Sequence, residues 1–417
     1  MRRIQMERFI TKEEEGRYLF LPFQVPERVE RVKICYFYDD EENIVDFGVA
    51  RSREDLVGWG GSTRKEVLIS IEGSSDGFRN VPITPGQWNI LLGAYRISAN
   101  GVRVSFEVIF YEKEYALWKG DIHVHSCASD GNFCYDQLLK LAHQEQLDYF
   151  FMTDHNNYRE MKSESQKEKV KIFSGVEWTT YKGHAGMLGK VRPFDNFVSN
   201  SMQETKKIFL KAKQRESLII LNHPFCPFCG WKWGTDGLLW DLLEIWNGAL
   251  TLEYNLKCVK WWEDRLLDGW EIPIVGGSDF HKVEKNRKIG HPCTCVFASS
   301  CEEGEVIKAL KKGNSFLTIS AQGPMLAVPK LHMFPGSRIE VNSELEWKFY
   351  QLEKKDVICI IQNGKEERIF CNTSEMIVKR SMKEEGYCRV EIRRIIQGQE
   401  LPIFFTNPYY IKKSGKY

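Results

Sequence analysis

The sequence lacks an apolar segment of membrane-spanning length. No apolar run approaches the roughly 18 residues that a transmembrane helix requires. The basic start, MRRIQMERFITKEEEGRY, is not followed by the apolar stretch of a secretory signal. The sequence therefore predicts a protein that does not cross a membrane, and we expect it in the cytoplasm.

An excess of charge of either sign is also absent. The chain has 58 Lys and Arg against 57 Asp and Glu, which gives a net charge of +1. Nucleic acids and anionic membranes attract strongly basic surfaces. The overall balance therefore indicates neither as a partner, although it says nothing about a local basic patch.

The sequence also lacks closely spaced cysteines. The 12 cysteines are scattered over 417 residues, which favours reduced thiols over a disulfide framework. Cys226 and Cys229 do form a C-x-x-C pair. A zinc knuckle needs a second pair at suitable spacing, and Cys293-x-Cys295 is a poor one; a redox pair normally opens a helix in a thioredoxin-like unit. We predict a structural or incidental role for this pair.

The length predicts two or three domains, and the changes in residue pattern along the chain suggest three. Residues 1–115 carry short strands rich in β-branched and aromatic residues between turn clusters, which predicts a β-sandwich. Trp59 and Trp88 in this region fit a glycan-binding platform or, more commonly, core and edge aromatics. Residues 323–417 return to strand texture and predict a small β domain. We expect strands at 31–38, 66–71, 88–92, 102–110, 345–350, 357–361 and 387–392.

Residues 116–322 alternate short apolar runs with segments of helical period. The expected strands are 149–152, 170–173, 218–221, 243–246 and 272–275, and the expected helices are 135–146, 203–216, 255–267 and 303–312. Buried strands that alternate with helices indicate a parallel α/β fold, plausibly a barrel.

Histidine is scarce, with nine residues in the chain, yet six of them follow or occupy the expected strands of this central region. Carboxylates accompany them. The nine candidate metal ligands are His123, His125, Asp130, His155, Glu177, His184, His223, Asp279 and His281. His123 and His125 share one face of an extended segment, because side chains alternate across a strand.

Each of these residues has an ordinary alternative. A single strand histidine is often a hydrogen-bonded structural residue, and an aspartate after a strand, such as Asp130 or Asp154, is often a helix cap or turn former. The carboxyl ends of barrel strands, however, meet at one mouth. Six imidazoles gathered there without a cation would cost much desolvation and repulsion, so the set predicts a metal site.

The motifs DIHVHSCASDG, TDHN, GVEWTTYKGH, NHP and GSDFH, in this order, resemble those of the PHP (polymerase and histidinol phosphatase) superfamily. The flanking FGVARSREDLVGWGGSTR, TPGQWNILLGAYRI and FFTNPYYI are similar to the CehA/McbA-like metallohydrolase branch. The resemblance implies a distorted (β/α)7 barrel with two or three divalent metals, flanked by an N-terminal β-sandwich and a small C-terminal β domain.

The resemblance also implies roles for individual residues. A first metal would be bound by His123, His125, Asp279 and a bridging Glu177. A second metal would be bound by Glu177, His184 and His223, and a third by Asp130, His155 and His281. Some members have His at the position of Asp130, and the GHAGMLG segment of His184 is less distinctive than the paired-His form of that branch. Asp121 and Asp154 lie beside ligands, so we expect them to orient imidazoles or to relay a proton. Lys282, Lys285 and Arg287 would contact an anionic substrate or lie solvated on the surface.

Imidazole and carboxylate ligands suit Zn, Mn or Fe. We therefore expect a metal-dependent phosphoesterase, in which a hydroxide that bridges two metals attacks a small phosphate ester. Hydrolysis of a carboxylic or carbamic ester by the same centre is the alternative within hydrolases. A non-catalytic metal-binding scaffold, with glycan- or protein-binding β domains, is the alternative from another class. The sequence does not indicate the oligomeric state.

Overall fold

The computed structural model describes residues 2–26, 29–39, 41–71, 73–112, 114–161, 169–284, 287–328 and 333–413. The chain divides into two compact units, Met1–Glu114 and Tyr115–Tyr417. Residues 116–322 and 323–417 both belong to the second unit, so their division into separate domains stays a prediction.

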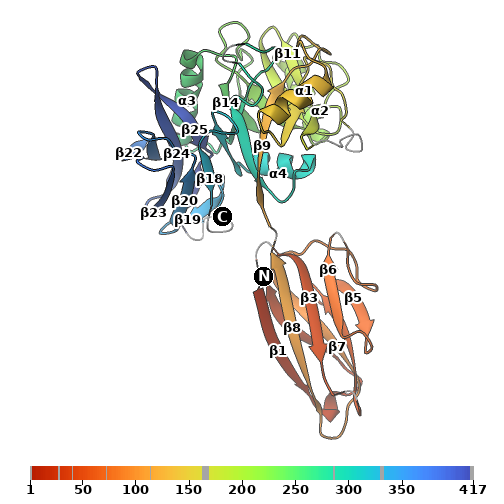
Figure 1. Cartoon of the computed structure of the whole chain (residues 1–417). Coiled ribbons are helices and arrows are strands. Elements are labelled where there is room, and N and C mark those ends of the chain that lie inside the picture. The colour runs from red at the N-terminus through yellow and green to blue at the C-terminus, as the bar shows by residue number, and fades with distance from the viewer. Residues whose placement is uncertain are drawn as a thin grey trace. The chain divides into compact units, whose positions relative to one another are not determined.

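The first unit consists of two antiparallel sheets (Figure 1). One sheet has the order β1 (Arg2–Ile10), β8 (Val102–Glu112), β3 (Val29–Phe37) and β6 (Glu66–Ser70). The other has the order β2 (Tyr18–Val25), β7 (Gly86–Arg96), β4 (Ile44–Ala50) and β5 (Leu56–Gly61), and a short 3-10 helix covers Lys12–Glu14. Alternate side chains of both sheets form one apolar core, as in a sandwich.

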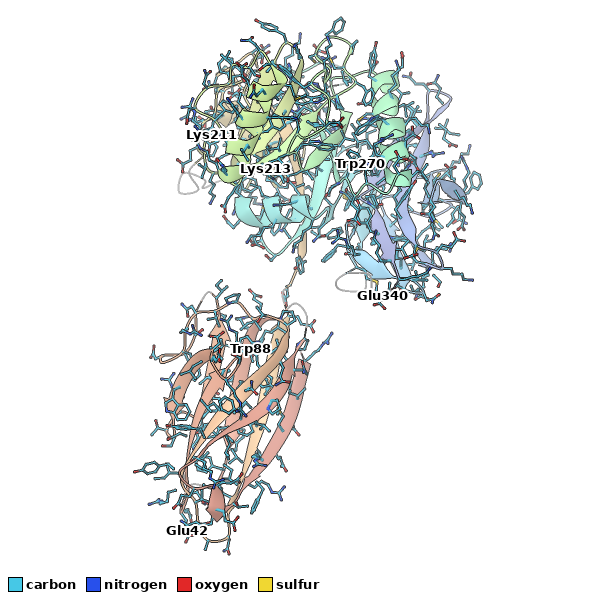
Figure 2. The ribbon with its side chains drawn as sticks, turned by 180° about the vertical axis from the view of Figure 1, so that it is seen from behind. Glu42, Trp88, Lys211, Lys213, Trp270 and Glu340 are labelled. Atoms are coloured by element: carbon cyan, nitrogen blue, oxygen red, sulfur yellow. The ribbon has the colours of Figure 1, made fainter. Side chains whose placement is uncertain are left out.

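The two tryptophans of this unit have different surroundings. Trp88 is 1% exposed and its indole N–H donates to the carbonyl of Thr84, so it is a core residue rather than a surface platform (Figure 2). Trp59 is half-buried and lies over Gly48 and Gly93, where a Cβ would stand within 3.1 Å of its ring. The glycine positions therefore make room for Trp59 on the sheet.

The second unit is built on a long row of strands. Seven of the strands described here lie consecutively in this row, in the order of the chain: β9 (Ala116–Val124), β10 (Tyr149–Met152), β11 (Lys171–Thr180), β12 (Gly183–Leu188), β13 (Leu218–Asn222), β14 (Leu242–Asn247) and β15 (Ile274–Gly277). The residues after β15 bond back to β9, because the N–H of Asp279 donates to the carbonyl of His123 and the N–H of His125 to that of Phe280.

This row does not show the distorted (β/α)7 barrel that we expected. In the described residues only α1 (Tyr135–Gln144), α2 (Met202–Gln214) and α3 (Leu252–Leu267) lie between its strands. β12 runs antiparallel to both neighbours, because only Tyr181 and Lys182 separate it from β11 and a turn this short cannot carry a parallel crossover. The alternation of strand and helix is therefore incomplete, and such a barrel is not shown.

The remaining strands extend the row beyond β9. In order from β9 they are β16 (Cys293–Ala298), β17 (Ser315–Thr318), β25 (Gln399–Thr406), β24 (Gly386–Ile396), β21 (Val357–Gln362) and β22 (Lys365–Phe370). In addition, β26 (Tyr409–Lys412) pairs with β24 and with β19 (Arg338–Glu340). A separate sheet contains β18 (Met325–Ala327), β20 (Glu344–Tyr350) and β23 (Glu375–Ser381), and α4 (Glu303–Lys311) precedes β17.

Side chains from the end of the chain hold the central strands. The amide of Asn407 accepts a hydrogen bond from the N–H of Ile274 at 2.7 Å and donates to the carbonyl of Ile274 at 3.1 Å. It also donates to the hydroxyl of Ser315 at 2.9 Å. Asn407 therefore fixes the start of β15, the strand that leads to Asp279.

Each expected strand and helix overlaps an observed element, and most ends shift by a few residues. The exception is β11, which continues past the expected end at 173 to Thr180. Each helix follows its apolar stripe; in α1, for example, Leu138 and Ala142 are buried. In α2 the side chain of Ser201 accepts the N–H of Glu204, which forms a capping box. None of the helices in the described residues is long and apolar enough to cross a membrane.

Candidate metal centre

Glu177 lies at the centre of the predicted ligands. It is on β11 and is fully buried. Histidine nitrogens approach its two carboxylate oxygens: Nε2 of His123 at 3.2 Å, Nε2 of His125 at 3.6 Å, Nδ1 of His155 at 2.9 Å, Nδ1 of His184 at 3.3 Å and Nε2 of His223 at 3.1 Å. One carboxylate therefore joins residues from five successive segments of the strand row.

Asp279 supplies a second carboxylate to the same cluster. Its Oδ1 atom lies 3.4 Å from Nε2 of His123 and 3.2 Å from Nε2 of His125. Asp279 has a φ of 52° and His223 a φ of 28°, conformations that non-glycine residues rarely adopt and that concentrate at functional sites. The neighbouring Gly277 is required for close approach, because a Cβ there would lie 2.3 Å from Cβ of His123.

Asp130, His155 and His281 form a more open part of the cluster. The Asp130 carboxylate lies 3.5 Å from Nε2 of His155 and 3.2 Å from Nε2 of His281. The His281 ring stacks on that of His125, with centroids 4.1 Å apart, so the open and buried parts adjoin. The side chain of Asp130 is 57% exposed, which leaves this part accessible from solvent.

Three of the imidazoles follow one pattern, in which Nδ1 meets a neighbouring group of the chain and Nε2 faces the cluster. The Nδ1 partners are Glu244 for His123 at 2.9 Å, Cys229 for His223 at 3.7 Å and the carbonyl of Asp279 for His281 at 2.9 Å. In His155, Nδ1 lies 2.6 Å from the hydroxyl of Thr179 and 2.9 Å from Glu177. A partner at Nδ1 fixes the tautomer and the orientation of the ring, as in histidines that bind metals through Nε2.

The donor atoms of the cluster fit divalent cations. In the described structure, buried atoms without a hydrogen-bond partner include Nε2 of His123, both ring nitrogens of His125, Oε2 of Glu177 and Nδ1 of His184. Buried polar atoms are normally paired, so a group of unpaired lone pairs that face one volume indicates a missing positive partner. Groups of these side chains bring their donor atoms within 4.8 Å of one another, as ligands of one ion must be.

The electrostatics agree with an anionic core surrounded by imidazoles. Burial alone would raise the pKa of Glu177, but His123 and His184 outweigh it and hold this pKa well below its usual range. Burial alone would lower the pKa of His123, but Asp279, Glu177 and Glu244 outweigh it and raise this pKa. Burial lowers the pKa of His125. Glu177 is therefore available as a carboxylate ligand.

Asp121 and Asp154 are buried but hold backbone and hydroxyl groups rather than imidazoles. Asp121 accepts the N–H groups of His123, Ser278 and Gly290, and burial raises its pKa to about 6. Asp154 accepts the N–H and the hydroxyl of Ser126, both at 2.7 Å, and the hydroxyl of Ser129. Asp154 therefore fixes the turn that presents Asp130.

Sequence reasoning missed Glu244, the carboxylate that contacts the imidazole of His123. Its other oxygen accepts the N–H of His223 at 2.7 Å and the Asn247 amide at 3.1 Å. Asn222 was also missed, and its amide donates to Glu177 at 2.9 Å. The signal for Glu244 was an acid inside an apolar strand, LLEIWN, where an unpaired charge would be costly.

Lys282 and Arg287 line a cavity of about 300 Å³ together with Asp130, Asp279 and His281. Lys282 pairs with Glu284 at 3.0 Å, and Arg287 donates to the carbonyl of Ala249 at 2.9 Å. Both basic side chains thus lie at the rim of the open part of the cluster. Lys285, the third basic residue that we predicted here, lies outside the described residues.

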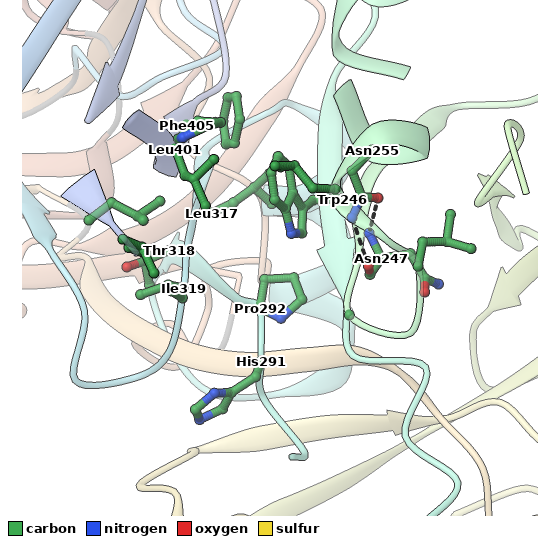
Figure 3. Close-up of a pocket in the computed structure, with 16 residues that line it drawn as sticks. Trp246, Asn247, Asn255, His291, Pro292, Leu317, Thr318, Ile319, Leu401 and Phe405 are labelled. Carbon is green, nitrogen blue, oxygen red and sulfur yellow. Dashed lines mark hydrogen bonds between the residues drawn. The ribbon is translucent and has the colours of Figure 1, made fainter. Parts of the chain in front are cut away.

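A second cavity, of about 420 Å³, adjoins the cluster through Asn247 (Figure 3). Its lining is largely apolar and includes Trp246, Leu317 and Phe405. The Asn247 backbone is held by two hydrogen bonds to Asn255, both 3.0 Å long, while its amide reaches Asp279 at 3.3 Å. One residue therefore belongs both to the cavity wall and to the surroundings of the candidate ligands.

Comparison with known proteins gave distant matches in structure alone. No family model and no curated protein matches the sequence. Similar solved structures include a two-domain protein containing a predicted PHP-like metal-dependent phosphoesterase from Bacteroides vulgatus ATCC 8482, with 17% identity over 70% of this chain and 95% of that chain and a TM-score of 0.39. Another is a proposed metal-dependent phosphoesterase from Bifidobacterium adolescentis ATCC 15703, with 14% identity over 41% of this chain and 90% of that chain and a TM-score of 0.29. At these identities and TM-scores the likeness carries no functional argument.

Proposed function

We propose that the chain is a metal-dependent hydrolase of the PHP type, in the CehA/McbA-like branch, and that it acts on a small phosphate ester. The observation that carries the proposal is the convergence of unpaired, buried imidazole and carboxylate atoms on Glu177 and Asp279. Such a donor set suits Zn, Mn or Fe. The groups of candidate donor atoms in the structure contain eight of the nine residues that the sequence motifs indicate, together with Glu244 and Cys229. Asp279, the ninth, lies 3.4 Å from His123 and 3.2 Å from His125.

The candidate ligands form three groups, one for each ion. The first ion would be held by His123, His125, Glu177 and Asp279. The second would be held by Glu177, His184 and His223, and the third by Asp130, His155 and His281. When bound, divalent ions supply a water of lowered pKa and positive charge for the oxygens of the substrate. Because Asp130 is a harder ligand than His, the third position would favour a harder cation than an all-histidine position.

The residues around the ligands prepare them for this role. Glu244 and the carbonyl of Asp279 each hold Nδ1 of a histidine, so that Nε2 keeps its lone pair toward the cluster. Lys282 and Arg287 at the rim would attract an anionic ester and orient its phosphate beside Asp130 and His281. We assign substrate binding, not proton transfer, to these two side chains.

Hydrolysis of a carboxylic or carbamic ester is the second candidate. The largely apolar cavity beside Asn247 favours it, because an aryl or alkyl ester needs an apolar surface near the reacting group.

One experiment decides between these candidates. The chain is stripped with a chelator, reloaded separately with Zn, Mn or Fe(II), and analysed for bound metal by mass spectrometry. Turnover is then measured with 4-nitrophenyl phosphate, bis(4-nitrophenyl) phosphate, 4-nitrophenyl acetate and an aryl carbamate. We expect metal-dependent turnover of a phosphate ester. It should disappear in Glu177→Gln and persist in His143→Gln, whose exposed imidazole lies on α1 outside the cluster.

Turnover of the acetate or carbamate alone would replace the phosphoesterase by the second candidate. A chain that binds metal but hydrolyses none of the four substrates would favour the non-catalytic metal-binding scaffold, and a chain that binds no metal would refute the proposed centre.

A further inference from the structure

Cys226 and Cys229 lie in the loop that follows β13, directly after His223. Their Sγ atoms are 2.7 Å apart, and the N–H of Cys229 donates to Sγ of Cys226 at 3.3 Å. The loop is closed by hydrogen bonds from the N–H of Cys226 to His223 and from the N–H of Gly230 to Cys226. A Cβ at Gly230 would lie 2.4 Å from the carbonyl of Cys226, so only glycine allows this closure. The loop holds the two sulfurs within reach of one disulfide bond.

The pair is also accessible, unlike the other close pair of thiols described in this chain. Cys226 and Cys229 are half-buried, and both are free. Cys293 and Cys295 lie 3.7 Å apart but are fully buried on β16. A small oxidant therefore reaches the loop pair and not the strand pair.

The loop pair touches the candidate metal centre through His223. Sγ of Cys229 lies 3.7 Å from Nδ1 of His223, while Nε2 of the same ring lies 3.1 Å from Glu177. When the Nδ1–H donates to this sulfur, the lone pair of Nε2 points toward the cluster, as metal binding requires. Forming the bond shortens the distance between the two sulfurs from 2.7 Å to about 2.0 Å, which draws Sγ of Cys229 toward Cys226.

We propose that Cys226 and Cys229 form a reversible dithiol–disulfide switch that controls metal binding at His223. The dithiol holds His223 in the metal-binding tautomer, and the disulfide releases it. The inference rests on the proposed metal centre but assigns a role to two residues outside its ligand set.

The oxidant that fits is a low-molecular-weight disulfide. One cysteine sulfur attacks it, which forms a mixed disulfide and releases one small thiol. The second cysteine sulfur attacks the mixed disulfide, forms the Cys226–Cys229 bond and releases the other small thiol. The protein gives up two electrons and two protons, and the small disulfide takes up both to become two thiols. An excess of the small thiol reverses the sequence.

The test uses the full chain with Cys127→Ser and Cys134→Ser, which remove the two exposed cysteines. The protein is treated with glutathione disulfide or with dithiothreitol, and excess reagent is removed. Peptide mass spectrometry then detects the Cys226–Cys229 bond, and titration against a chelating dye gives the zinc affinity of both forms. We expect the bond to form and one zinc to bind about 10–100-fold more weakly in the oxidised form.

Two variants separate the switch from a structural role. Cys226→Ser cannot form the bond but keeps the contact of Cys229 with His223, so its zinc affinity should be high and unaffected by glutathione disulfide. Cys229→Ala should bind one zinc weakly under both conditions, because it loses the sulfur that accepts from Nδ1 of His223. Circular dichroism checks that each variant folds, and Cys226→Ala replaces Cys226→Ser where it does not.

A bond that never forms, or one that forms without changing zinc affinity in a protein that binds zinc, would overturn the switch and leave the proposed function intact. A reduced protein that binds no metal at all would overturn both.

Discussion

Nδ1 of His123 donates a hydrogen bond of 2.9 Å to Oε1 of Glu244, and both side chains are fully buried. The other Glu244 oxygen accepts the N–H of His223 at 2.7 Å. One carboxylate that is not itself a predicted ligand thus orients two histidines that are. Its negative charge also helps to raise the pKa of His123.

Replacing Glu244 by glutamine should weaken metal binding without removing a ligand. The glutamine amide donates to Nδ1 of His123, which drives the proton to Nε2 and blocks the lone pair. We expect the metal affinity to fall by about 10–100-fold, as for other residues that support metal ligands. Competition with a chelating dye measures it. Glu253→Gln on the exposed surface of α3 is the matched control, and equal affinities in the two variants would contradict the assigned role.

The absence of a side chain at Gly277 should be necessary for the cluster. In Gly277→Ala the added Cβ would lie 2.3 Å from Cβ of His123 and 2.7 Å from Oε1 of Glu244. Such overpacking typically costs about 1–3 kcal/mol of unfolding free energy, and displacement of His123 should also reduce the bound metal. Denaturant unfolding and metal analysis measure the two effects.

Gly304→Ala in α4 is the control, since its Cβ meets nothing within 4 Å. It should stabilise the helix by roughly 0.5–1 kcal/mol. A Gly277→Ala chain as stable and as metal-loaded as this control would show that the crowding is relieved at no cost.

Asp154 should act through the turn that carries Asp130. Asp154→Ala leaves the buried N–H and hydroxyl of Ser126 without their acceptor, which costs about 1–3 kcal/mol. Because Asp130 follows this turn, the third ion should be lost while the first two are retained. Metal titration by calorimetry should show fewer bound ions per chain. Asp136→Ala, exposed on α1, should retain all of them, and an Asp154→Ala chain with its full metal content would refute the prediction.

The ion pairs of Glu391 should make the stability of the second unit depend on pH in the acid range. Burial alone would raise its pKa, but Arg389 and Arg393 outweigh it and lower the pKa below the ordinary value of 4.5. The charged pair therefore stabilises the fold above pH 4.5 and loses this contribution as the pH falls through the lowered pKa of the folded state.

Glu391→Gln should lower the unfolding free energy at neutral pH by roughly 1–3 kcal/mol, because the buried Arg389 loses one of its two carboxylate partners and keeps only Glu263. The difference from the original chain should shrink below pH 4.5. Denaturant unfolding at a series of pH values measures it, with Glu375→Gln on the exposed surface as control. A difference that stays constant with pH would argue against the ion pair as its source.

The sequence predicted which side chains lie together better than the fold around them. His123, His125 and Asp279 were expected together because polar residues at the carboxyl ends of neighbouring strands meet at one edge, and the structure places them there. The antiparallel β12 was not foreseen, because GHAGML has the apolar texture of any buried strand and its direction depends on the two-residue turn before it. Glu244 was not foreseen because it lies inside the apolar run LLEIWN and not at the carboxyl end of that strand, where the other side chains were expected.

Trp88 shows the converse limit. The sequence does not distinguish an aromatic side chain that faces the core from one that faces a ligand. Which of the two applies depends on the opposite sheet, which is formed by residues distant in sequence. The outcome for Cys226 and Cys229 is similar, since their spacing alone did not reveal that one sulfur touches His223.

Asn407 has a consequence for how this chain can vary. Its side chain clamps Ile274 at the start of β15, and it comes more than a hundred residues after Asp279, the ligand that β15 presents. A protein cut after residue 322 would keep every candidate ligand yet lose the group that secures the last central strand. We therefore expect the candidate metal centre and the C-terminal strands to be retained together, because a central region without Asn407 lacks the hydrogen bonds that fix β15.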